Sequence, residues 1–142
     1  MVQISECTTI AAMERNFPLL QLLYNTLTEE KYYSMLHDMQ PMGYRQVGVL
    51  IEGKYVAIAG FHCATHLSSG RYLYVDDLVV EPNHRGKQYS KALLLYLEEE
   101  AKRFHCQHIF LDAFVENNPA HKIYHAQGFA IAAFHFIKTI NK

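Results

Sequence analysis

A polar turn at residues 78–94 (LVVEPNHRGKQYSKALL) has the composition of an anion-binding site. The apolar residues at its beginning are typical of a strand, and the pattern from about Tyr89 onward predicts an amphipathic helix. A turn that opens onto a helix N-terminus exposes backbone N–H groups, which can hold a phosphate or a pyrophosphate. Alone, this pattern has low specificity, because many α/β proteins have such a loop with no ligand in it.

Two neighbouring carboxylates, Asp76 and Asp77, lie in the β-rich run just before this turn. Burying adjacent carboxylates is costly unless they are paired, so this pair is a candidate for function. In a regular strand Asp77 faces away from Asp76, and a bulge would exchange the two. The face of Asp76 is then shared by Tyr72, Tyr74 and Leu78. The alternative is that one carboxylate caps a turn or pairs with Arg71, and the residues favour neither interpretation.

The hydrophobic periodicity predicts the elements that position these residues. Strands are expected at residues 2–6, 44–51, 55–65, 71–80, 108–114 and 129–140. Helices are expected from Thr8 or Thr9 to about Asn25 with a break or kink at Pro18, from Thr28 to about Met39, from about Tyr89 to Phe104, and from Asn117 to Gln127. The order is βααβββαβαβ. Hairpins followed by a parallel βαβ unit (residues 73–112) predict a mixed α/β (α+β) sheet with helices on both faces.

Composition narrows the class of protein further. The chain has 142 residues, half of them hydrophobic, which predicts a single domain over residues 1–142. A net charge of -1 gives no basic excess for nucleic acid. Cys7, Cys63 and Cys106 form no CxxC pair, which favours reduced thiols. With no basic leader and no apolar run of roughly 18–20 residues, we expect a cytoplasmic protein without membrane contact.

Nine histidines raise the question of a metal site. His62-Cys63-x-x-His66 and His105-Cys106-x-His108 look like ligand sets. Neighbouring side chains in a strand point to opposite faces, however, so His62 and Cys63 cannot easily share one ion. The second cluster falls at a helix–strand turn, where polar residues are ordinary. We therefore expect no metal.

A second pattern lies near the C-terminus: Asn117-x-x-Ala120-x-x-Ile123-Tyr124-x-x-x-Gly128-Phe129. Together with the polar turn, at this separation, it resembles the GNAT superfamily of acyl-CoA-dependent N-acetyltransferases. The resemblance covers about residues 44–140. It implies a sheet with a splayed parallel pair of strands, where pantetheine pairs with the exposed backbone like an additional strand.

The resemblance implies acetyl-CoA (coenzyme A) as the cofactor and assigns residues to it. Main-chain contacts to pantetheine are expected from Leu78, Val79 and Val80. The pyrophosphate is expected on backbone amides of Arg85, Gly86, Lys87, Gln88, Tyr89, Ser90 and Lys91. Asn117 would reach pantetheine from the other side of the splay, and Tyr124 would lie near the sulfur.

The polar turn departs from the family pattern Arg/Gln-x-x-Gly-x-Gly/Ala at two positions, Gln88 and Ser90. Glycine permits a positive φ and a close backbone approach. A non-glycine residue at positive φ costs on the order of 1–2 kcal/mol. The Gln88 substitution is thus expected to weaken cofactor binding without abolishing it.

Acetyl transfer to an amine needs a neutral amine, a polarised carbonyl and a stabilised leaving thiolate. Tyr124 is the candidate acid, and Asp76, through a water, is the candidate base. A backbone N–H of Leu78 or a neighbour would polarise the carbonyl. Each assignment has a structural alternative, such as a core tyrosine at position 124.

Aromatic and histidine residues are candidates for the acceptor side. Tyr24 and Tyr32 lie on the N-terminal helices, which usually cover the acceptor in this family, and Tyr74 lies on the strand of Asp76. His135, expected in the last strand, could relay a proton, as could His62. The alternative is that these residues are structural.

The sequence therefore predicts an N-acetyltransferase that moves an acetyl group from acetyl-CoA to a primary amine of a small molecule. Alternatives are a protein or peptide N-acetyltransferase, a non-catalytic acyl-CoA-binding module, and a structural α/β protein without a CoA site. A homodimer through the last strands is a family expectation only.

Overall fold

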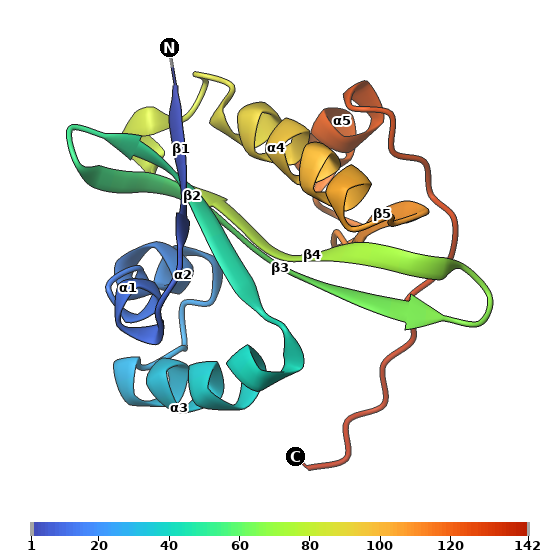
Figure 1. Ribbon diagram of the computed structural model, residues 1–142, viewed down its shortest axis with the longest axis horizontal. Coiled ribbons are helices and arrows are strands. Elements are labelled where there is room, and N and C mark those ends of the chain that lie inside the picture. Colours follow the sequence, from blue (N-terminus) through green and yellow to red (C-terminus); the bar gives the residue numbers. More distant parts are fainter. Residues whose placement is uncertain (1, 142) are drawn as a thin grey trace. The chain divides into compact units, whose positions relative to one another are not determined.

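The computed structural model describes residues 2–141 (Figure 1). These residues form two compact units, residues 2–111 and residues 112–141. The first unit holds all the strands that the structure describes, and the second holds a short helix and an irregular segment.

The first unit is built on a five-stranded sheet whose strands follow each other in chain order. The strands are β1 (Gln3–Cys7), β2 (Arg45–Ile51), β3 (Lys54–His66), β4 (Gly70–Val80) and β5 (His108–Leu111). The pairs from β1 to β4 are antiparallel, and β4 and β5 are parallel. The mixed sheet expected from the sequence is thus confirmed.

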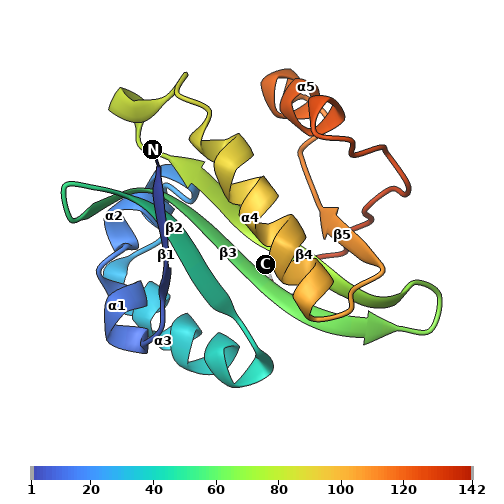
Figure 2. The same ribbon diagram turned by 45° about the horizontal axis from the view of Figure 1, so that its top comes forward.

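Helices cover both faces of this sheet (Figures 1 and 2). On one face lie α1 (Ile10–Glu14), α2 (Phe17–Leu23) and α3 (Glu29–Met39), and on the other lies α4 (Tyr89–Arg103). The side-chain oxygens of Thr9 and Thr28 accept from backbone N–H groups in the first turns of α1 and α3. The helix expected up to Asn25 is two helices, because the break falls at Asn16 and Pro18 lies in the first turn of α2, where its missing N–H costs nothing.

Each face has its own packing. The face of α1–α3 carries an apolar cluster with Leu20, Leu36 and Ile58. Through its centre runs a polar chain in which Gln46 accepts from Asn16 and donates to the hydroxyls of Tyr32 and Tyr44. Because these buried groups are hydrogen-bonded, their burial is tolerated.

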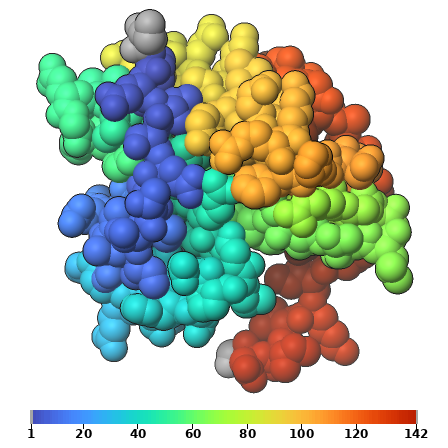
Figure 3. All heavy atoms as spheres, in the orientation of Figure 1, coloured from blue at the N-terminus to red at the C-terminus, as the bar shows by residue number. Residues whose placement is uncertain are grey.

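On the other face, α4 buries Leu93, Leu97 and Ala101. Arg45 on β2 lies 2.6 Å from the Glu6 carboxylate on β1 and 2.8 Å from the buried Glu100 carboxylate on α4. These contacts join the sheet to the helix. Figure 3 shows the atoms of β1 next to those of α4 on the face that it draws. A buried carboxylate needs such a cation, so Glu100 and Arg45 depend on each other.

The second unit contains α5 (Asn118–Ala126) and a following segment without helix or strand. The prediction of a strand over residues 129–140 is therefore wrong, and the strand expected over 108–114 ends at Leu111. Side chains such as Phe134 and Phe136 are 78% and 91% exposed. β-rich composition gives a propensity, but a strand also needs a partner for its backbone groups, and the segment has none in residues 2–141.

The longest helix, α4, has 15 residues. No helix in the described part of the chain combines the length and apolar character needed to cross a membrane.

Candidate active site

The parallel strands β4 and β5 pair only over part of their length. Their register runs from Tyr72 opposite His108 to Val75 opposite Leu111. Beyond Val75, β4 continues to Val80 and pairs with β3 alone. Within residues 2–111, the backbone groups on the β5 side of Leu78, Val79 and Val80 thus have no neighbouring strand.

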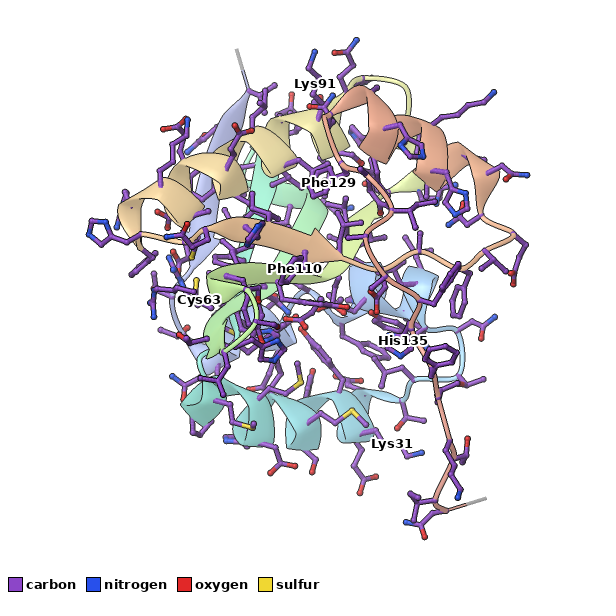
Figure 4. All side chains as sticks on the ribbon, turned by 90° about the vertical axis from the view of Figure 1, so that its right-hand side faces the viewer. Lys31, Cys63, Lys91, Phe110, Phe129 and His135 are labelled. Carbon is purple, nitrogen blue, oxygen red and sulfur yellow. The ribbon has the colours of Figure 1, made fainter. Side chains whose placement is uncertain are left out.

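The turn between β4 and α4 presents free amides. Gly86 and Gln88 both have left-handed backbones, with φ of 80° and 62°. The first helical bond joins the Ala92 amide to the Gln88 carbonyl at 3.1 Å. Helix geometry therefore leaves the amides of Tyr89, Ser90 and Lys91 without an acceptor inside α4. Figure 4 shows Lys91 at this end of the helix.

These residues fit a pyrophosphate. A Cβ placed on Gly86 would have nothing within 4 Å, so a ligand can approach this part of the turn. The Gln88 side chain makes no capping hydrogen bond and leaves the amides of the first turn exposed. The helix N-terminus adds a partial positive charge.

Gln88 confirms the expectation that this position requires a positive φ. Its cost, on the order of 1–2 kcal/mol, is already present in the folded chain without a ligand. Since binding then requires no new strain at this residue, the cost reduces the stability of the fold more than the affinity for a ligand.

A β-bulge in β4 changes the faces expected for the two carboxylates. Gly60 on β3 lies opposite Asp77, and Phe61 lies opposite Val75, so Asp76 is an additional residue in β4. Beyond the bulge, Val79 joins the apolar cluster under α1–α3, and Leu78 falls on the opposite face. The prediction that Leu78 shares a face with Tyr72 and Tyr74 is therefore wrong.

Asp77 is held by two tyrosine hydroxyls. Tyr44 donates to its Oδ2 at 2.6 Å, and Tyr24 from the end of α2 donates to its Oδ1. Burial, followed by the charge and hydrogen bond of Asp77, raises the pKa of both tyrosines. Tyr24, 42% exposed, also lies 3.3 Å from the Asp76 carbonyl oxygen, so this expected acceptor-side residue does lie beside the carboxylates.

Asp76 pairs with His62 on β3. The distance from His62 Nδ1 to Asp76 Oδ2 is 2.7 Å, and both side chains are partly exposed. Burial raises the pKa of Asp76, the contact with His62 lowers it, and the Asp77 charge raises it, with a net upward shift. The Tyr74 ring stacks on the His62 ring, so Tyr74 is also part of this cluster.

Two other predicted acceptor-side residues, Tyr32 and His135, have partners within their own units. Tyr32 is only 5% exposed, and its hydroxyl donates to the Met13 carbonyl at 2.6 Å, so it is a core residue. His135 is not in a strand; in the irregular segment of the second unit its Nδ1 lies 2.8 Å from Asp112. The helical periodicity of the sequence could not distinguish a tyrosine that lines the acceptor site from a tyrosine in the core.

In the second unit, Asn117 and Tyr124 lie at the start of α5 and within it. The Asn117 side chain accepts from the Ala120 amide at 3.3 Å and caps the helix. Gly128, with φ of 91°, follows its end. Burial raises the pKa of Tyr124, so its hydroxyl stays protonated at neutral pH. Two residues of the sequence pattern, Asn117 and Gly128, thus also have a structural role, because they mark the start and the end of α5.

No group of three or more His, Cys, Asp or Glu side chains in residues 2–141 is arranged to hold a metal ion.

A free helix N-terminus after a strand that leaves its parallel neighbour fits an acyltransferase that uses acyl-CoA. The model of the acetyltransferase (GNAT) family matches residues 10–129, and the chain belongs to this family. It is an N-acetyltransferase that uses acetyl-CoA, which confirms the enzyme class and the cofactor predicted from the sequence.

Curated relatives of the chain are N-acetyltransferases. The chain is 24% identical over 142 residues to an uncharacterized N-acetyltransferase of Bacillus subtilis strain 168, covering 99% of this chain and 100% of that protein. It is 28% identical over 92 residues to the aminoalkylphosphonate N-acetyltransferase of Salmonella typhimurium strain LT2. That match spans 64% of this chain and 60% of the relative's length.

The same fold occurs in the aminoglycoside N-acetyltransferase AAC(6')-Iy, whose structure was solved in complex with CoA. The TM-score is 0.83 at 14% identity, over 99% of this chain and 97% of the other. At this identity the similarity establishes the fold.

Proposed function

We propose that the protein transfers the acetyl group of acetyl-CoA to a primary amine of a small molecule. The observation that carries this proposal is the carboxylate pair Asp76–Asp77 on β4, which lies among a histidine of β3 and two tyrosines, one at the end of α2 and one just before β2. Carboxylates and aromatic rings attract an ammonium group, which is the form of most primary amines at neutral pH. Relatives that act on aminoalkylphosphonates and aminoglycosides support a small amine acceptor.

Acetyl-CoA supplies the acetyl group as a thioester. The residues proposed to hold it are the β4 backbone from Leu78 to Val80, the turn from Arg85 to Lys91, and Asn117. Asp76 helps to remove a proton from the amine. The protonated hydroxyl of Tyr124 is the general acid that gives a proton to the leaving thiolate. The Tyr124 assignment rests on the family pattern together with the pKa that burial raises.

The test is a panel of amines assayed by thiol release from acetyl-CoA, with mass spectrometry of the products. The panel contains an aminoalkylphosphonate, an aminoglycoside, a short diamine and a peptide with a free N-terminus. We expect acetylation of at least one small amine with a kcat/KM at least about tenfold above that for the peptide. Turnover confined to the peptide would contradict the small-molecule assignment.

A further inference from the structure

His62 lies at the centre of the side chains that surround Asp76. In the β3–β4 pairing it is directly opposite Tyr74. Its Nδ1 lies 2.7 Å from Asp76 Oδ2, and its side chain is 31% exposed. The ring is therefore bound on one side and accessible on another.

The surroundings fix both the orientation and the tautomer of this imidazole. The Tyr74 ring stacks on it with 5.7 Å between centroids and 24° between planes. The Tyr72 ring meets it edge-on at 6.5 Å and 74°. An ionised carboxylate only accepts hydrogen bonds, so Nδ1 carries the hydrogen. Nε2 then keeps its lone pair, and within residues 2–141 it makes no hydrogen bond.

We propose that His62 Nε2 takes the proton from the acceptor amine, and that Asp76 is a positioning residue that acts through it. This proposal rests on the proposed function. The amine nitrogen bonds to the acetyl carbon and loses a proton to Nε2, while the carbon–sulfur bond breaks and the thiol leaves with the proton that Tyr124 donates. The water expected between Asp76 and the amine is thus replaced by His62.

The charges around the ring suit this role. When His62 gains a proton, the imidazolium lies against the Asp76 carboxylate and forms an ion pair with it. The bulge in β4 gives each carboxylate its own partners. Asp77 accepts hydrogen bonds from tyrosine hydroxyls, and Asp76 pairs with His62. The titratable groups nearby are Asp76, Asp77, Tyr72 and Tyr74 from β4, Tyr24 from α2, Tyr44 before β2, and His66 on β3 itself.

The test compares three variants of the full chain with acetyl-CoA and the best amine of the panel. His62→Asn keeps an amide donor toward Asp76 but has no group at the Nε2 position. We expect it to lower kcat/KM by about 100-fold or more, to lose the acidic limb of the pH–rate profile, and to regain activity with added imidazole. The calorimetric Kd for acetyl-CoA should change less than about threefold.

Asp76→Asn should shift His62 from the Nδ1–H to the Nε2–H tautomer, visible in the ¹⁵N spectrum, with a loss of kcat/KM that Asp76→Glu partly restores. His66→Asn is the matched control. His66 is also on β3, and its Nε2 lies 3.2 Å from the Tyr72 hydroxyl without a carboxylate partner, so its replacement should leave the rate unchanged.

Each outcome decides one assignment. A His62→Asn variant with the wild-type rate and pH profile would overturn the role of His62. So would a loss that is equal at every pH and insensitive to imidazole, because that behaviour indicates a structural effect. If the wild-type protein releases no thiol with any amine, the proposed function has failed instead.

Discussion

Replacement of Tyr124 by phenylalanine is expected to lower kcat by about 100-fold or more, the usual contribution of a general acid. The change removes one hydroxyl and keeps the ring, whose edge-on contact with Phe129 helps to place it. Burial raises the pKa of this hydroxyl, which keeps its proton available at neutral pH. Steady-state kinetics measure the loss of kcat, and calorimetry should show little change in CoA binding.

The matched control removes a tyrosine hydroxyl far along α4. Tyr96→Phe changes a residue outside the turn and outside the carboxylate cluster, so kcat should stay within about twofold of the wild type. Equal kcat values for the Tyr124→Phe variant and the wild type would show that Tyr124 only packs against its neighbours.

Replacement of Gly60 by alanine is expected to lower the free energy of unfolding by about 2–3 kcal/mol. A Cβ at this position would fall on the Tyr44 hydroxyl and on Asp77 Oδ2, both of which are held in the polar cluster. The methyl group must therefore displace the carboxylate or the strand. Urea unfolding of the variant and the wild type measures the difference.

A double-mutant cycle identifies the cause of this loss. Tyr44→Phe removes the hydroxyl that the new methyl group would meet, so it should recover part of the stability lost in Gly60→Ala. The recovery stays partial because the Tyr44 ring carbon Cζ also lies 2.8 Å from the added Cβ. Strictly additive effects of the two substitutions would argue that Gly60 is needed for another reason.

Local patterns predicted most of the first unit. The three hairpin strands and α4 follow from periodicity and turn residues, and the helix expected from Thr28 is α3, which the Thr28 side chain caps. The positive φ at Gln88 followed from the glycine that the family pattern has there. In each of these cases the information lies within a few residues.

Features that depend on residues far apart in the sequence could not be predicted from such local patterns. The bulge at Asp76 depends on the register between β3 and β4, and the pairing of His62 with Asp76 joins residues 14 positions apart. Tyr32 and Tyr24 are both tyrosines of N-terminal helices, yet only packing decides that the first is buried and the second half-exposed. The strand expected after Gly128 had suitable residues but no partner strand.

Binding of acetyl-CoA to the turn before α4 is tested most directly by calorimetric titration of the purified protein, with free CoA as comparison. Because the left-handed Gln88 is already present in the folded chain, we predict micromolar affinity with one site per chain. A folded sample that shows no binding up to millimolar acetyl-CoA would contradict the assignment of this turn as the cofactor site.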